Sequence, residues 1–222
     1  MKREKQYKKE GCGSMAAVKK FSMQEIYQQL RHIERTIQNP KNADIDPGRR
    51  ELNYSFVEDR GMTSYDYFLK RKSELYCRKQ ADLKPMAGWV VTAPDDLPEE
   101  EEQDFFQYVH AFLAERYGGE QNCIQSVVHY DESGRPHLHF YFVPTVPDVR
   151  HGGFKISAKL RLDRKELRNF HPDLQRYLKE QGIHGTVHNG ITAKQGGNRT
   201  VKELKQERQR ERERVMGRSW NR

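Results

Sequence analysis

The segment HYDESGRPHLH (residues 129–139) connects two apolar stretches, and it predicts the β-hairpin around which the fold is built. The stretch before it, CIQSVVHYD (123–131), and the stretch after it, PHLHFYFVP (136–144), are both strand candidates. The Glu-Ser-Gly-Arg sequence between them suits a tight connection. We therefore expect the two strands to be neighbours in an antiparallel sheet.

Three histidines of this hairpin are expected to converge. Side chains at positions i and i+2 of a strand point to the same face, so His137 and His139 present two imidazoles on one side. His129 lies on the preceding strand, near the end that pairs with them. Imidazole suits Mn²⁺, Zn²⁺, Fe or Ni, and a site with three ligands leaves positions open for substrate oxygens. A single histidine is more often a core or surface residue, but three at this spacing predict a metal site.

Two carboxylates, Asp131 and Glu132, follow His129 at the hairpin corner. They can be the polar residues of a turn, or they can orient an imidazole and assist proton transfer. Glu132 is the better candidate for the chemical role, because Asp131 can also serve the turn.

A second cluster, His32-Ile-Glu34-Arg35, lies late in a helix that we predict over residues 23–37. A histidine and an arginine three residues apart share one helical face. Together they could supply a nucleophile or proton carrier beside a phosphate clamp. Taken alone the cluster is a weak signal, because His, Glu and Arg on a helix are usually just solvated.

The other predicted elements alternate irregularly, which favours an α+β fold on an antiparallel sheet. Further helices are predicted over 64–80, 99–118 and 162–182, and further strands over 52–57 and 88–93. Residues 1–14 are interpreted as a flexible basic lead, and residues 200–222 as a charged helical extension. The main domain would then span residues 15–199.

The composition indicates which class of binding partner and which cellular compartment to expect. The net charge of +8 in 222 residues favours a polyanionic partner. No apolar run is long enough for a membrane span. The three cysteines form no CxxC pair, which indicates reduced thiols and a cytoplasmic location.

With both clusters in view, the chain resembles the MobV (Pre/Mob) family of plasmid mobilisation relaxases, within the HUH endonuclease superfamily. Three motifs match in order, and the similarity runs from about residue 15 to residue 204. The motifs are His32-x-Glu34-Arg35, the segment from Asp44 through Tyr54, and the segment from His129 through His139. The chain departs from the family at Ser55, where an acidic residue is common.

The resemblance implies a relaxase catalytic domain with a five-stranded antiparallel sheet flanked by helices, in which the three histidines hold Mn²⁺ or Mg²⁺. It implies that one strand is nicked at an origin of transfer, on single-stranded and hairpin DNA, and later rejoined. The attacking residue would be His32, giving a 5′-phosphohistidine, with Arg35 at the phosphate and Glu132 orienting or deprotonating His32. A dimer through a C-terminal region and a coupling protein are further partners that we consider.

DNA binding is expected to use cations together with polar and aromatic side chains. The residues predicted for this role are Asn53, Tyr54, Arg49, Arg50, Lys194 and Arg199.

Four alternatives stay open at this point. Tyr177 is a rival nucleophile, which would make the chain a rolling-circle replication initiator. A non-catalytic DNA-binding autorepressor is a second alternative, and a purely structural metal domain is a third. A histidine-triad nucleotide hydrolase is the weakest, because Tyr141 stands where its third histidine would be.

Overall fold

The computed structural model describes residues 15–187, apart from 38–44, 79, 81 and 133. The basic lead predicted for 1–14 and the charged helical extension predicted for 200–222 lie outside the described residues.

A five-stranded sheet forms the middle layer, with every strand pair antiparallel and the strand order β1-β3-β5-β4-β2. Its strands are β1 (Ala16–Phe21), β2 (Tyr54–Ser55), β3 (Met86–Thr92), β4 (Cys123–His129) and β5 (His137–Phe142). A separate two-stranded sheet pairs β6 (Thr145–Pro147) with β7 (Phe154–Ile156). The expected α+β class and the five-stranded antiparallel sheet are confirmed.

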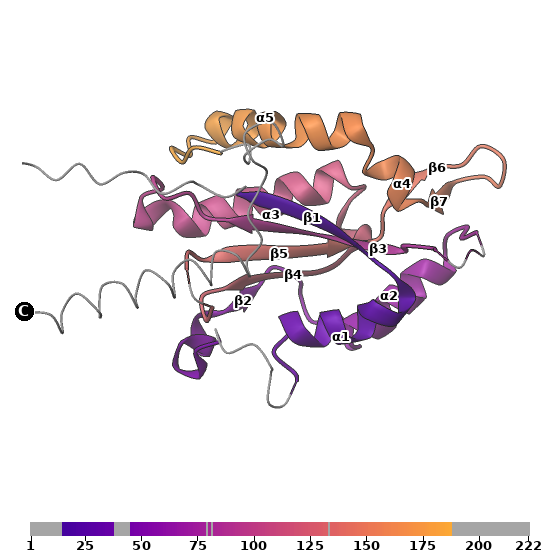
Figure 1. Cartoon of the computed structure of the whole chain (residues 1–222), viewed down its shortest axis with the longest axis horizontal. Helices are drawn as coiled ribbons and strands as arrows, with labels where there is room; N and C mark the ends of the chain where they lie inside the picture. Colours follow the sequence, from indigo (N-terminus) through magenta and orange to yellow (C-terminus); the bar gives the residue numbers. More distant parts are fainter. Residues whose placement is uncertain (1–14, 38–44, 79, 81, 133, 188–222) are drawn as a thin grey trace, which may run out of the picture. The chain divides into compact units, whose positions relative to one another are not determined.

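Helices cover both faces of the sheet, α1 and α2 on one side and α3 and α5 on the other (Figure 1). They are α1 (Met23–Ile33), α2 (Ser64–Ser73), α3 (Glu102–Arg116), α4 (Ala158–Arg161) and α5 (Arg164–Glu180). Short 3₁₀ helices span Pro47–Leu52, Glu99–Glu101 and Glu120–Asn122. None of the described helices is long and apolar enough to cross a membrane.

The alternation of side chains along β5 separates an apolar face from a polar one. Leu138 and Phe140 are buried in the core beneath α3 and α5. Tyr141 belongs to the second core, beneath α1 and α2. Because residues two apart on a strand share a face, His137 and His139 lie on the Tyr141 side. The histidines of β5 therefore lie on the α1–α2 face of the sheet.

Gly88 of β3 is required by a close approach, because it faces Tyr141 across the β3–β5 pairing. A Cβ atom at Gly88 would lie 1.9 Å from Cε1 of the Tyr141 ring. We expect Gly88→Ala to lower the free energy of unfolding by roughly 1–3 kcal/mol, because the ring must leave its packed position. Urea unfolding measures this, and combining Gly88→Ala with Tyr141→Leu should recover part of the loss. An unchanged urea midpoint for the single variant would contradict it.

Helix α1 begins where the sequence predicts but ends earlier. Ser22 and Glu25 form a capping box at its start. The helix ends at Ile33, and Arg35 has a positive φ of 55°. The prediction of a helix through residue 37 is therefore wrong, and so is the expectation that Arg35 shares a helical face with the histidine before it.

Other boundaries also differ from the predictions. The strand predicted over 52–57 is reduced to two residues, because a 3₁₀ helix occupies the preceding segment through Leu52. The helix predicted over 64–80 ends at Ser73, whereas α5 continues through Pro172. The edge strand β1 is not among the predicted elements.

Candidate active site

The three histidines of the β4–β5 hairpin converge, as predicted. His129 at the end of β4 pairs directly with His137 on β5, and His139 follows two residues later. The ring centroids of His129 and His139 are 4.7 Å apart, and those of His137 and His139 are 4.9 Å apart. One nitrogen from each ring lies within 4.8 Å of the other two, so a single ion can be reached by all three.

His139 carries the strongest sign that this cluster fits a metal ion. Both of its ring nitrogens are buried, and neither has a hydrogen-bond partner in the described part of the chain. Burying an unpartnered polar group costs free energy, which coordination of a cation would offset. The neutral imidazoles of this cluster are donors that Mn²⁺ accepts, so the residues present fit a divalent cation.

The pKa values of these histidines favour the neutral, ligating form. Burial lowers the pKa of His139 well below its ordinary value, with the other two rings adding to the effect. Burial and the positive charge of Arg35 lower the pKa of His129 to about 4. Burial also lowers the pKa of His137, against the opposing effect of Glu132. Since protons compete with metal ions for imidazole, this shift keeps the cluster available to a metal at neutral pH.

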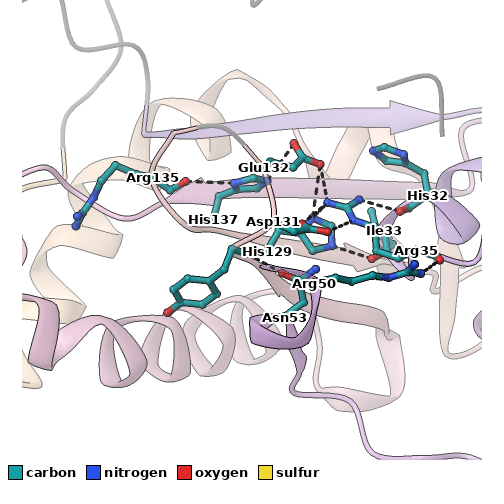
Figure 2. Close-up of polar contacts among 11 residues, drawn as sticks. His32, Ile33, Arg35, Arg50, Asn53, His129, Asp131, Glu132, Arg135 and His137 are labelled. Atoms are coloured by element: carbon teal, nitrogen blue, oxygen red, sulfur yellow. Dashed lines mark hydrogen bonds and ion pairs between the residues drawn. The ribbon is translucent and has the colours of Figure 1, made fainter. Parts of the chain in front are cut away.

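The orientation of the His129 ring is fixed by the end of α1. Nε2 of His129 lies 2.8 Å from the carbonyl oxygen of Ile33, and a carbonyl can only accept, so Nε2 carries the proton. Nδ1 therefore holds the lone pair, and it lies 3.0 Å from Nη2 of Arg35. The end of α1 and the β4–β5 hairpin therefore contact each other through His129, one of the three candidate metal ligands (Figure 2).

Arg35 lies in a buried ion-pair cluster. Its Nε and Nη2 atoms donate to the two carboxylate oxygens of Asp131 at 2.8 and 2.7 Å, and Nη2 also donates to Glu132 at 2.7 Å. Nη1 donates to the carbonyl oxygen of His32 at 2.9 Å (Figure 2). Burial acts to raise the pKa of Asp131, but the Arg35 hydrogen bonds outweigh it and hold that pKa below its usual range. The guanidinium therefore fixes both carboxylates and the helix end together.

The second motif braces the hairpin corner through the backbone. The N–H of Asp46 donates to the carbonyl oxygen of Asp131 at 2.7 Å. Oδ1 of Asn53 accepts from the N–H of Tyr130 at 2.7 Å, and Arg50 donates to the carbonyl oxygen of Arg35. This bracing was missed in the sequence, where only the Asp-Pro start of a turn hinted at it.

His32 occupies the last turn of α1, next to Arg35 (Figure 2). Its ring makes no hydrogen bond with any residue that the structure describes, and it lines a small pocket with Arg35, Pro47 and the exposed Arg50. Burial, with the charge of Arg35, lowers the pKa of His32 despite the opposing carboxylates. A half-buried neutral imidazole facing a pocket has a lone pair available for nucleophilic attack.

The remaining predicted residues lie in different surroundings. Tyr54 is half-buried, with its ring against Phe56 and Tyr130. Arg49 is exposed on the 3₁₀ helix that precedes it. Tyr177 packs on Phe112 with ring centroids 5.4 Å apart, within the core of α3 and α5. Tyr177 is therefore on the face of the sheet opposite the histidines. Lys194 and Arg199 lie outside the described residues.

The depressed histidine pKa values predict a loss of stability at acidic pH in the absence of metal. The unfolded chain, with histidine pKa values near 6.5, takes up protons before the folded chain does, so the free energy of unfolding should fall as pH drops from about 6.5 towards 4. Urea unfolding in EDTA across this range measures the slope. His139→Leu should flatten it, and the exposed His184→Ala should not. Equal slopes for wild type and His139→Leu would contradict the prediction.

Comparison with known protein families gives a match along most of the chain. The profile of the family described as "Plasmid recombination enzyme" (Mob_Pre) matches residues 13–206. A plasmid recombination enzyme from Streptococcus agalactiae is 34% identical over 186 residues, which are 79% of this chain and 35% of that protein. Another from Lactiplantibacillus plantarum is 33% identical over 183 residues, or 78% of this chain and 48% of that protein. The chain thus spans between about a third and a half of these relatives.

Solved structures agree with this match. The MobM relaxase domain (MOBV; Mob_Pre), in Mn-bound crystal structures with plasmid pMV158 oriT DNA, is 29% identical with a TM-score of 0.70, covering 88% of this chain and 98% of that one. A second Mn-bound structure of that domain, with 22nt pMV158 oriT DNA, is 28% identical, with a TM-score of 0.71.

Proposed function

Because the chain belongs to the plasmid recombination enzyme (Mob_Pre) family of MOBV relaxases, we propose that it nicks one strand of plasmid or mobile-element DNA at an origin of transfer and rejoins it. One observation carries the proposal: a neutral, half-buried His32 faces a pocket next to three imidazoles suited to a divalent cation. The MobM relaxase domain, whose fold this chain shares, is described as bound to oriT DNA with Mn.

His32 is the proposed nucleophile. A ring nitrogen of His32 uses its lone pair to form a P–N bond in line, while the bond from phosphorus to the 3′ oxygen breaks. The 3′ oxygen takes a proton from water and becomes a free hydroxyl, and the phosphate stays joined to the 5′ end. Glu132 accepts the proton from the other ring nitrogen of His32. The phosphoramidate keeps the energy of the broken bond, so the reverse attack by a 3′ hydroxyl rejoins the strand.

A divalent cation held by His129, His137 and His139, Mn²⁺ or Mg²⁺, would supply Lewis-acid stabilisation of charge on the scissile phosphate.

The two arginines near His32 have different proposed roles. Arg35 was expected at the phosphate, but its donors already serve Asp131, Glu132 and a backbone carbonyl, so we assign it to positioning those groups. Arg50 is exposed on the same pocket as His32, and it is the better placed cation for a phosphate oxygen.

The proposed substrate sets the partners and the compartment. Single-stranded and hairpin DNA at the origin of transfer would be bound in the cytoplasm. A dimer through a C-terminal region and a coupling protein remain part of the proposal.

Covalent capture tests the proposed function. The protein is mixed with supercoiled plasmid carrying the DNA upstream of its gene, with Mn²⁺ or with EDTA. We expect nicking and a protein–DNA adduct only with Mn²⁺, and an adduct that acid breaks but alkali does not, as a phosphoramidate requires. EDTA should leave the circular dichroism spectrum folded, because an open catalytic site does not hold the fold together.

Tyr177→Phe distinguishes the rival nucleophile. It should form the same adduct as wild type, because Tyr177 packs on the far face of the sheet. An adduct that survives both acid and alkali and disappears in Tyr177→Phe would replace His32 with tyrosine chemistry. Metal-independent duplex binding without any nicking would support the autorepressor instead.

A further inference from the structure

The β6–β7 ribbon lies outside the main sheet (Figure 1). The buried carboxylate of Asp148 braces the turn of the ribbon, directly after β6, with His151 Nδ1 at 2.7 Å and Lys155 Nζ at 3.5 Å. The His151 ring stacks on Tyr76 with centroids 3.6 Å apart and planes 11° apart. Backbone hydrogen bonds join Tyr76 to the strand at Phe154.

This ribbon exposes apolar side chains. Val149 in the turn is fully exposed at 100%, and Phe154 at the start of β7 is 53% exposed. Gly152 and Gly153 adopt positive φ values, which let the chain turn tightly between the two strands. A firmly held element with apolar residues at its exposed end is typical of a contact surface.

The surface around the ribbon is basic. Between residues 145 and 162 the sequence contains four cations, Arg150, Lys155, Lys159 and Arg161. The single carboxylate in that stretch is Asp148, which is 4% exposed and already paired. Lys155 pairs with Asp148 and the Arg161 guanidinium lies over the Tyr117 ring, so the exposed positive charge of the ribbon and of α4 comes from Arg150 and Lys159. Exposed positive charge of this kind suits a polyanion.

We propose that the β6–β7 ribbon binds the double-stranded part of the origin DNA, with its tip in the major groove, an inference that rests on the proposed function. The major groove is wide enough to admit a two-stranded β-ribbon. Arg150 at the tip reaches base edges, Val149 contacts thymine methyl groups, and Lys159 at the base contacts phosphates. An extended single strand would use stacking platforms and would not need a projecting ribbon.

The position of the ribbon sets where on the DNA it acts. Two of the metal-site histidines, His137 and His139, lie at the start of β5, and the ribbon follows its other end, after residue 142. The five steps from His137 to Phe142, at about 3.3 Å each, cover roughly 17 Å along the strand. Since duplex DNA rises 3.4 Å per base pair, the ribbon footprint should begin roughly five base pairs from the scissile phosphate.

The test measures binding of the full chain to two DNA probes by fluorescence anisotropy. One probe is the origin strand with its hairpin, and the other is the nick-site strand without self-complementarity. The variant Val149→Ser/Arg150→Ala should bind the hairpin probe about tenfold or more weakly, because it loses the contacts to base edges and to thymine methyl groups. Its affinity for the unpaired strand, and nicking of that strand, should equal wild type.

Arg176→Ala is the matched control, because Arg176 is an exposed arginine on α5 already paired with Asp173. It should bind both probes like wild type. If wild type nicks and binds, but the ribbon variant binds the hairpin probe equally well, the ribbon does not contact duplex DNA. If the variant weakens binding to both probes alike, the ribbon is a general electrostatic surface and the groove assignment is wrong. If wild type neither binds nor nicks origin DNA, the proposed function itself fails.

Discussion

His32→Ala is expected to abolish the covalent protein–DNA adduct and to lower Mn²⁺-dependent nicking on the order of 10⁴-fold or more. The alanine side chain has no lone pair to form the P–N bond, and among the described residues no other histidine lines the pocket that His32 faces. Three imidazoles of the neighbouring cluster are turned towards one another, and that of His129 already donates to a backbone carbonyl. Denaturing gels with labelled DNA measure the adduct, and plasmid relaxation measures the nicking rate.

His184→Ala provides the matched histidine control, because His184 is exposed and paired with Glu101. It should nick at the wild-type rate. His32→Ala should keep its melting temperature and its Mn²⁺ affinity, since the ring makes no hydrogen bond in the described part of the chain. An adduct of normal yield in His32→Ala would remove His32 from the reaction.

Arg35→Met is expected to lower the free energy of unfolding by about 3–5 kcal/mol. Methionine keeps an unbranched apolar side chain but leaves Asp131 fully buried without its charged partner, and Glu132 loses the same donor. The loss is large because a buried carboxylate without a counter-charge has given up its hydration. Urea unfolding at pH 7 gives the value.

Two further variants distinguish the effect of losing the buried ion pair from the effect of losing any arginine. Arg31→Met removes a guanidinium that donates to the exposed carbonyl oxygen of Thr36, and it should change stability by less than about 0.5 kcal/mol. Adding Asp131→Leu to Arg35→Met should recover part of the stability, because no unpaired charge then remains at the deepest position. If Arg35→Met alone is as stable as wild type, the ion pairs of this cluster do not offset the free energy lost when its charged groups are buried.

The metal cluster could be predicted from the sequence because it depends on local rules. The spacing of His137 and His139 on a strand, and a short connection back to His129, fix three side chains with one pairing. The fold class followed in the same way from the sequence of strands and helices. The alternation of side chains along a strand and the short length of the hairpin connection are sufficient to predict both the histidine cluster and the fold class.

The surroundings of His32 could not be predicted in this way. Arg35 leaves the helix with a positive φ because it pairs with Asp131, which is 96 residues away in the sequence. Helical periodicity carries no information on such a partner. The inward-facing Asn53, which was expected to contact DNA, likewise depends on a hydrogen bond to a distant backbone N–H.

The strand order also sets a sequence of assembly. The metal ligands come together through β4 and β5, which are joined by the short connection 130–136, whereas β1 must find β3 some 70 residues along, with Ala16 opposite Val91. Short loops close at a lower entropy cost, and isolated hairpins form in about 1–10 μs, well before distant strands pair. His32, the proposed nucleophile, lies on α1, which comes between the edge strands β1 and β2 in the sequence, so it joins the site only when the distant pairings form. A folding chain is therefore expected to gather the three histidines early and to add His32 last.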